Sequence, residues 1–251
     1  MRIDIWSDIV CPFCYVGKRN LEQALAEFEH RDEVEVVWHS FELDPSATEH
    51  PAGSLPEMIA GKYQMSLEQA IASQESLAER AREVGLDFNW RQARYGNTFD
   101  AHRVIHYAAE QGLASAAQEA FKLAYFTQGR SVQDHESILD IASEIGLDTA
   151  EVEAVLKSDR YAADVRADEQ LARQLGINGV PFFLIESKWA VSGAQPAKML
   201  VQALRQVWEE THRVEFLNPL AGATGDAAGN NATEAGSATA GASCDVNGNC
   251  S

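Results

Sequence analysis

Polar and apolar residues alternate at the start of the chain, over residues 2–6 (RIDIW). Strict alternation is typical of a half-buried strand, because successive side chains of a strand point to opposite faces. Over residues 12–28 the apolar positions recur at helical spacing, and Pro12 suits a first helical turn because its missing N–H costs nothing there. β-branched and aromatic residues return over residues 34–41 (VEVVWHSF). The chain is therefore predicted to begin with a strand, a helix and a strand.

The stretch from residue 45 to residue 162 is predicted to be almost entirely helical. Ser66 and Gln69 form a capping box in front of one helix. That helix is expected to run to about Val84, where Gly85 can end it in a left-handed cap. Similar signals predict further helices: residues 99–110 and 115–125, a helix capped by Asp134 and closed by Gly146, a short helix opened by Asp148 with Glu151, and residues 162–175 leading to Gly176.

Strand character resumes near the end of the folded part. Residues 181–185 (PFFLI) and 189–191 (WAV) are predicted to be short strands, and residues 196–211 a final helix. The predicted order is β-α-β, a long helical insertion, and then α-β-β-α. Without the insertion, this α/β order is that of a thioredoxin fold.

The composition changes abruptly after Pro219. Residues 221–243 contain only Gly, Ala, Ser, Thr, Asn, Asp and Glu, so residues 220–243 are predicted to be a flexible tether. We therefore expect three parts: a thioredoxin-like domain of residues 1–44 and 163–219, a helical insertion domain of residues 45–162, and a flexible tail of residues 220–251 that carries Cys244 and Cys250.

The chain of 251 residues is strongly acidic, since 38 Asp and Glu against 20 Lys and Arg give a formal charge of −18. This charge repels phosphate groups, so neither nucleic acid nor a membrane is an expected partner. No apolar run approaches the roughly 18–20 residues of a membrane span. Asp4 and Asp8 interrupt the apolar stretch that a signal peptide would need. A cytoplasmic protein is predicted, and in that reducing compartment close cysteine pairs are more often catalytic, redox-sensing or metal-binding than structural.

Cys11 and Cys14, in the sequence CPFC, are expected where the first helix begins. The unpaired N–H groups and partial positive charge of a helix N-terminus stabilise a thiolate, which is the form of cysteine that attacks. Cys11 is expected at the solvent-exposed tip with a lowered pKa, and Cys14 one turn further in. Cys11 would attack a disulfide and Cys14 would resolve the mixed intermediate, with Pro12 and Phe13 completing the catalytic motif.

Two other interpretations of this pair stay open. A CxxC can be half of a zinc site, but zinc needs four ligands, the nearest downstream histidine is His30, and there is no second CxxC. No metal is therefore expected. The other alternative is a pair of unreactive core cysteines, although the proline between them and the strand before them indicate a poised turn.

Several stretches together resemble one family: DIWSDIVCPFCYVGK, NTFDAHRV, AYFTQGRSVQDHE, and GVPFFLI with VSGAQP. They are similar to the DsbA-like thioredoxin-fold oxidoreductases, specifically the FrnE branch, which is related to 2-hydroxychromene-2-carboxylate isomerases and kappa-class glutathione transferases. The resemblance implies a helical domain that overhangs the dithiol, and a role in oxidative stress. It also implies a cis peptide bond between Val180 and Pro181 that faces Cys11, where the backbone of an extended substrate would dock.

The chain departs from the pattern of many thioredoxin-fold enzymes at Ile5, where those enzymes hold a buried acid that relays a proton. Asp8 is the nearest substitute and, with His102, a candidate residue of the active-site cleft. A turn residue that caps the helix is the competing interpretation for Asp8. The resemblance also implies that His102 and Arg103 lie near the active-site cleft, where they could touch glutathione or a substrate acid. The alternative is that His102 and His106 are ordinary packing or surface residues, and a zincin pattern would need Glu where Arg103 lies.

The tail carries a second cysteine pair. Cys244 and Cys250 flank Asn247 and Gly248, a favoured tight-turn dipeptide. A flexible tether of this length spans roughly 25–30 Å, so the tail could reach Cys11. We expect an auxiliary shuttle or regulatory dithiol that exchanges with the CPFC pair. The alternative is a disordered terminus whose thiols do nothing specific or bind metal opportunistically.

The sequence favours a thiol–disulfide oxidoreductase or disulfide isomerase that acts on protein disulfides and needs no cofactor. Glutathione or a thioredoxin-type protein is the expected reductant, because the cytosol suits reductase or isomerase work better than net oxidation. A glutathione-dependent isomerase or transferase for a small aromatic or polyketide-like substrate stays open as another class. A non-catalytic thioredoxin-like binding module would need a dithiol that resists alkylation at neutral pH.

Overall fold

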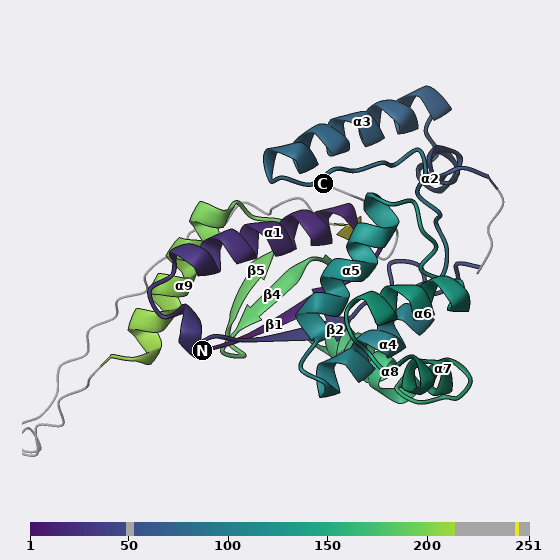
Figure 1. Cartoon of the computed structure of the whole chain (residues 1–251). Coiled ribbons are helices and arrows are strands. Elements are labelled where there is room, and N and C mark those ends of the chain that lie inside the picture. Colours follow the sequence, from purple (N-terminus) through teal and green to yellow (C-terminus); the bar gives the residue numbers. More distant parts are fainter. Residues whose placement is uncertain (49–52, 214–243, 246–251) are drawn as a thin grey trace, which may run out of the picture.

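The centre of the molecule is a mixed four-stranded sheet in the order β2-β1-β4-β5 (Figure 1). The computed structural model describes residues 1–48, 53–213 and 244–245. Strand β1 runs parallel to β2 and antiparallel to β4, and β5 pairs antiparallel with β4 at the edge. The predicted thioredoxin-like arrangement of strands is therefore confirmed. The strands are β1 (Arg2–Ser7), β2 (Glu35–Ser40), β4 (Phe182–Ile185) and β5 (Trp189–Ser192).

Strand β1 is covered on both faces. Ile3 and Ile5 pack against helices α1 (Pro12–Glu27) and α9 (Ala197–Thr211). On the other face, the indole N–H of Trp6 donates to the backbone carbonyl of Asp168 at 3.1 Å. Every residue of β1 after Arg2 is buried, so the expectation of a half-buried strand is wrong. The alternation reflects two different covered faces, one of them apolar and one partly polar.

The long insertion between β2 and β3 is helical, as predicted. The Gln69 N–H donates to Ser66 Oγ at 3.1 Å, which forms the predicted capping box of α3. Helix α2 was not predicted, although Ser54 and Glu57 form a second capping box at its start. No helix among the described residues has the length and apolar character required to cross a membrane. The helices are α2 (Leu55–Tyr63), α3 (Leu67–Glu83), α4 (Phe99–Glu110), α5 (Ala114–Phe126), α6 (His135–Glu144), α7 (Thr149–Leu156) and α8 (Ala162–Gln174), and a 3-10 turn, Arg31–Glu33, precedes β2.

A small second sheet joins distant parts of the chain. Strand β3 (Gly179–Val180) pairs antiparallel with β6 (Cys244–Asp245). The sequence analysis did not predict this pairing. The predicted tether over residues 220–243, Cys250, and the turn at Asn247 and Gly248 lie outside the described residues.

Candidate active site at the CPFC motif

The two thiols of the CPFC motif lie at the N-terminal end of helix α1. Cys11 is the N-cap residue, and Pro12 occupies the first turn. The Cys11 carbonyl accepts hydrogen bonds from the Cys14 N–H at 3.1 Å and the Tyr15 N–H at 3.3 Å. Both cysteines are free thiols. The sequence-based placement of the pair at the start of a helix is therefore confirmed.

Cys11 is not at an exposed tip, contrary to expectation. Its side chain is fully buried in a cluster to which Trp6, Phe41 and Val180 belong. Its Sγ donates to the Val180 carbonyl oxygen at 3.6 Å. Burial, with the neighbouring Cys14 thiol, raises the pKa of Cys11 well above its usual range. The expected lowering of this pKa is therefore wrong for the described arrangement, because distant segments cover a position that local sequence places at a helix end.

The pKa of Cys14 is shifted in the direction opposite to that of Cys11. Burial would raise its pKa, but the Cys11 thiol, the Lys122 ammonium and the Ser7 hydroxyl lower it, and the net direction is downward. Lys122, on helix α5, is fully buried, and burial lowers its own pKa to about 8. Sequence reasoning missed Lys122 because a single lysine in a helix is ordinarily solvent-exposed.

Asp8 and His102 form a buried pair, with Asp8 Oδ1 lying 3.3 Å from His102 Nε2. Asp8 also accepts the Ile9 N–H at 2.6 Å and the Leu43 N–H at 2.8 Å. Both side chains are at most 1% exposed, so the expectation that they border an open cleft is wrong. Burial would raise the pKa of Asp8, but His102, the Leu43 N–H and the Thr98 side chain hold it below its usual range. This bonded carboxylate ties the loop before α1 to the segment after β2. No side chain caps the start of α1, so the interpretation of Asp8 as a helix cap is wrong, and its role as a proton relay stays a prediction.

Arg103 and His106 form hydrogen bonds to other segments of the fold and do not line the cavity beside the motif. Arg103 is 4% exposed as a whole residue, so it offers almost no surface to glutathione or a substrate acid. His106 Nε2 lies 3.1 Å from Ser40 Oγ and 3.2 Å from Asp168 Oδ2. Within the described ranges, His, Cys, Asp and Glu form no group of three or more that could hold a metal ion. The acceptors of the Arg103 hydrogen bonds are Asp100 Oδ1 and the backbone carbonyls of Val155, Ser158 and Arg160.

The loop that contains Pro181 packs closely on helix α1. The Val180–Pro181 peptide bond is cis, as the resemblance implies. A Cβ atom on Gly17 would lie 2.8 Å from Pro181 Cγ and 3.4 Å from Phe183 Cζ. Only glycine therefore lets α1 approach the loop this closely. Sequence reasoning missed Gly17, although a glycine inside a helical pattern is the signal that would have found it.

Strand β6 pairs with the same loop. Cys244 lies opposite Val180, and Asp245 lies opposite Gly179. The backbone of Cys244 is therefore next to the residue whose carbonyl oxygen is 3.6 Å from Cys11 Sγ.

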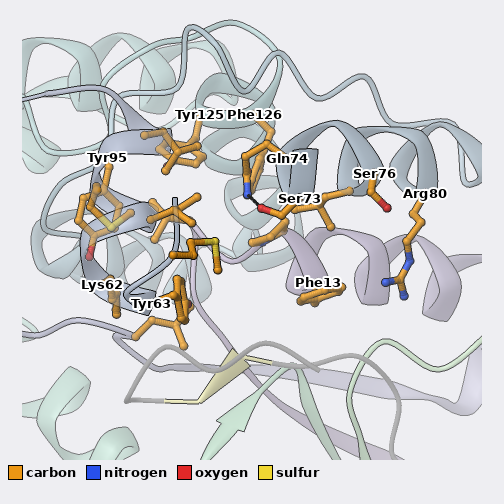
Figure 2. A pocket seen from close by; sticks show the side chains of 18 residues that line it. Phe13, Lys62, Tyr63, Ser73, Gln74, Ser76, Arg80, Tyr95, Tyr125 and Phe126 are labelled. Atoms are coloured by element: carbon orange, nitrogen blue, oxygen red, sulfur yellow. Dashed lines mark hydrogen bonds between the residues drawn. The ribbon is translucent and has the colours of Figure 1, made fainter. Parts of the chain in front are cut away.

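A cavity of about 350 Å³ lies beside the motif (Figure 2). Pro12 and Phe13 contribute to its lining, together with apolar residues of α2 and α3 such as Met58 and Leu77. In Figure 2, Arg80 projects from its helix toward Phe13, and its guanidinium carbon is 5.4 Å from the centre of that ring. The sequence analysis did not anticipate this cavity because it did not predict α2.

Comparison with known proteins finds the same combination of elements elsewhere. Residues 2–205 match the family described as DSBA-like thioredoxin domain. The probable DsbA oxidoreductase SCO1869 from Streptomyces coelicolor is 47% identical, with a TM-score of 0.81, over 86% of this chain and 94% of that chain. The uncharacterized protein YwbO of Bacillus subtilis is 28% identical over 187 residues, which cover 74% of this chain and 86% of that protein. A 2-hydroxychromene-2-carboxylate isomerase shares the fold at 16% identity, with a TM-score of 0.64, over 84% of this chain and 98% of that chain.

Proposed function

The chain belongs to the family of DSBA-like thioredoxin domains, and we propose that its CPFC dithiol reduces or isomerises protein disulfides. One observation carries this proposal: two free thiols lie at the start of α1, and the Val180 carbonyl oxygen is 3.6 Å from Cys11 Sγ. A substrate strand that paired with the Val180 backbone would thus bring its sulfur to Cys11.

The proposed reaction is a pair of thiol–disulfide exchanges. The Cys11 thiolate attacks a substrate disulfide, a mixed disulfide forms, and one substrate sulfur leaves as a thiolate. Cys14 then attacks Cys11 Sγ and releases the second substrate sulfur. The substrate gains two electrons and the CPFC pair becomes a disulfide. In isomerisation, a different substrate thiolate attacks the substrate sulfur of the mixed disulfide, which forms a new substrate disulfide and releases the Cys11 thiolate.

Substrate access requires Cys11 to be uncovered. In the described arrangement β6 occupies the edge of β3, where an extended substrate would pair. We infer that this arrangement is a closed form. When β6 leaves and water reaches Cys11, the burial that raises the pKa of this thiol is relieved, and the helix N-terminus favours the thiolate.

The pairing of β6 with β3 also supports an exchange role for the tail. Cys244 would attack Cys11 of the oxidised pair and release the Cys14 thiolate. Cys250 would then attack Cys244, which leaves a reduced CPFC pair and a Cys244–Cys250 disulfide. Glutathione or a thioredoxin-type protein would reduce the tail again, which fits a cytoplasmic setting.

Insulin reduction and reactivation of scrambled protein test the proposed function. Cys11→Ser should abolish both activities, because no mixed disulfide can form. Cys14→Ser should trap a mixed disulfide at Cys11. When the tail starts as the Cys244–Cys250 disulfide and no other substrate is present, attack by Cys11 should give a link to Cys244 or Cys250 within one chain and release the other tail thiolate. Wild-type rates in the Cys11→Ser variant would contradict the proposal, and a trap that never contains a tail cysteine would remove the shuttle.

The apolar cavity favours a second candidate function. Lys62 and Arg80 line the cavity together with aromatic side chains, which would suit a small aromatic acid. Glutathione would then be the co-substrate of an isomerase or transferase reaction, with the dithiol incidental. Turnover of a small aromatic acid that survives the Cys11→Ser substitution would favour this alternative, whereas its loss together with insulin reduction would reject it.

A further inference from the structure

Lys122 of helix α5 is a buried lysine without an acidic partner. Its side chain is fully buried, and its Nζ donates to Gln118 Oε1. In the part of the chain that the structure describes, no carboxylate lies within ion-pair distance of this Nζ. Lys18, another buried lysine, instead pairs with Glu22 and Glu119. Because a buried ammonium without a counter-charge is costly, Lys122 calls for a functional explanation.

The geometry of α5 directs Lys122 toward the first turn of α1. Glu119, three residues before Lys122, accepts a hydrogen bond from Tyr15 Oη at 2.6 Å. Tyr125, three residues after Lys122, lines the cavity beside the CPFC motif. Residues three apart are neighbours on a helix surface. Lys122 therefore lies on the face of α5 between a residue bonded to α1 and a residue that lines the cavity beside the motif.

Some groups around Lys122 raise its pKa and others lower it. Burial lowers its pKa to about 8, the thiolate forms of the two motif cysteines and the Asp8 carboxylate favour its charged form, and Lys18 disfavours it. The centre of the Trp38 ring is 6.0 Å from Nζ. The titratable groups that face it are Cys11 and Cys14 of the motif, Asp8 before the motif, Lys18 of α1, and, through Asp8, His102 of α4.

We propose that Lys122 is a positioning residue that supplies the positive charge opposite the Cys14 thiolate during the resolving step. The inference rests on the proposed oxidoreductase function. In this step a bond forms between Cys14 Sγ and Cys11 Sγ, and the bond between Cys11 and the substrate sulfur breaks. The substrate thiolate leaves and takes up the proton that Cys14 released. The CPFC pair is oxidised, the substrate is reduced, and Lys122 keeps its proton.

The first test measures the titration of Cys14 alone, in a full chain with Cys11, Cys244 and Cys250 replaced by Ser. Lys122→Met should raise the midpoint of the ultraviolet thiolate absorbance by about one pH unit or more, which is about tenfold less thiolate at neutral pH. Lys18→Met, which removes a buried ammonium that has acidic partners, should leave the midpoint in place. An unchanged midpoint in folded Lys122→Met protein would overturn the inference.

The second test measures the resolving step itself, in a full chain with both tail cysteines replaced by Ser. Reduced protein is mixed with Ellman's reagent, and the second release of thionitrobenzoate reports the attack of Cys14 on Cys11. Lys122→Met should slow this phase about tenfold at neutral pH and move its pH profile upward, with a smaller effect on the first phase, because Cys14 is coupled to Lys122 more strongly than Cys11 is. A purely structural role for Lys122 would change thermal stability and leave the profile of the second phase unaltered.

A third measurement needs no variant and guards against a Lys122→Met protein that fails to fold. Lysine labelled at Cε reports each ammonium titration by NMR. One lysine should titrate near 8 in the reduced protein and at a lower pH in the disulfide form, because coupling between the thiolate and the ammonium is reciprocal. Lysines that all titrate at ~10.4 in both forms would overturn the inference. If insulin reduction is absent while these midpoints shift as stated, the proposed function fails and the charge pairing stands.

Discussion

Gly17 sets how closely helix α1 approaches the loop that contains Pro181. A methyl group at this position would lie 2.8 Å from Pro181 Cγ, so the helix or the loop must move. We predict that Gly17→Ala lowers the free energy of unfolding by about 1–3 kcal/mol, as overpacking does. Because the loop also carries the carbonyl that faces Cys11, insulin reduction should slow as well. Denaturant unfolding and the turnover rate check the two effects.

Gly61→Ala is the matched control, because a Cβ on this glycine of α2 meets nothing within 4 Å. In a helix, alanine is favoured over glycine by roughly 0.5–1 kcal/mol, so this variant should be as stable as the wild type or slightly more stable. Equal losses for the two variants would show that close contact with Pro181 is not the reason for glycine at position 17.

Individual residues were predictable only where their role is set by near neighbours in the sequence. The CPFC motif marks Cys11 and Cys14 as a pair at a helix start because two intervening residues and a proline are local features. The burial of Cys11 was not predictable, because Phe41 and Val180 reach it from distant parts of the chain. Lys122 was missed for the same reason: nothing near it in the sequence distinguishes it from a solvent-exposed lysine.

At the scale of elements, helices with capping signals were predictable to within a residue or two. Ser66 with Gln69 and Asp148 with the N–H groups that follow it form the expected caps. Helix α2 has the same signal at Ser54, so its omission reflects a missed local pattern and not a distant contact. The β3–β6 pair was not predictable, because two strands of two residues each carry no periodicity and pair only across the folded structure.

A charged network joins the elements β1, β2 and α8. His39 of β2 bonds Asp168 Oδ1 of α8 at 2.6 Å and Asp4 Oδ1 of β1 at 2.8 Å. Burial would lower the pKa of His39, but the two carboxylates raise it. Burial would raise the pKa of Asp168, but His106 and His39 hold it well below its usual range. The network therefore favours a charged imidazole between two carboxylates.

The network predicts how stability depends on pH. The His39 contribution is complete below its unfolded pKa of ~6.5 and is lost as the pH rises through its raised folded-state pKa, at up to about 1.4 kcal/mol per pH unit. The Asp168 contribution is present above its unfolded pKa of ~3.9 and is lost as the pH falls through its lowered folded-state pKa. The network therefore stabilises most between about pH 4 and pH 6.5. Urea unfolding across the pH range measures the loss of stability on both sides of this window, the acid limb and the alkaline limb of the stability profile.

His39→Gln should flatten the alkaline limb of this profile, because no proton is then released there on unfolding. His135→Gln, at a half-exposed histidine that lies 2.8 Å from Asp100, is the control and should keep the wild-type slope. An alkaline limb that stays equally steep in His39→Gln protein would contradict the role assigned to the network.

At the scale of the whole molecule, three parts of the chain meet at the dithiol. The sheet and α1 position the thiols, as Figure 1 shows for the strands below that helix. The helical insertion contributes Lys122, the His102 partner of Asp8, and the cavity beside Phe13. Strand β6 pairs with the loop that faces Cys11. Reactivity of Cys11 should therefore depend on the tail, although the tail is more than two hundred residues away in the sequence.

The most direct test is the alkylation rate of Cys11 as a function of pH, read residue by residue by mass spectrometry. It should be measured in the full chain and in a chain that ends at Arg213. Without the tail, we predict rapid alkylation of Cys11 at neutral pH, with Cys14 protected; in the full chain, alkylation should be at least about tenfold slower, as expected if the thiolate population falls by a pKa unit or more. If Cys11 stays unreactive until strongly alkaline pH in both chains, it is not the attacking thiol, and the proposed oxidoreductase function is wrong.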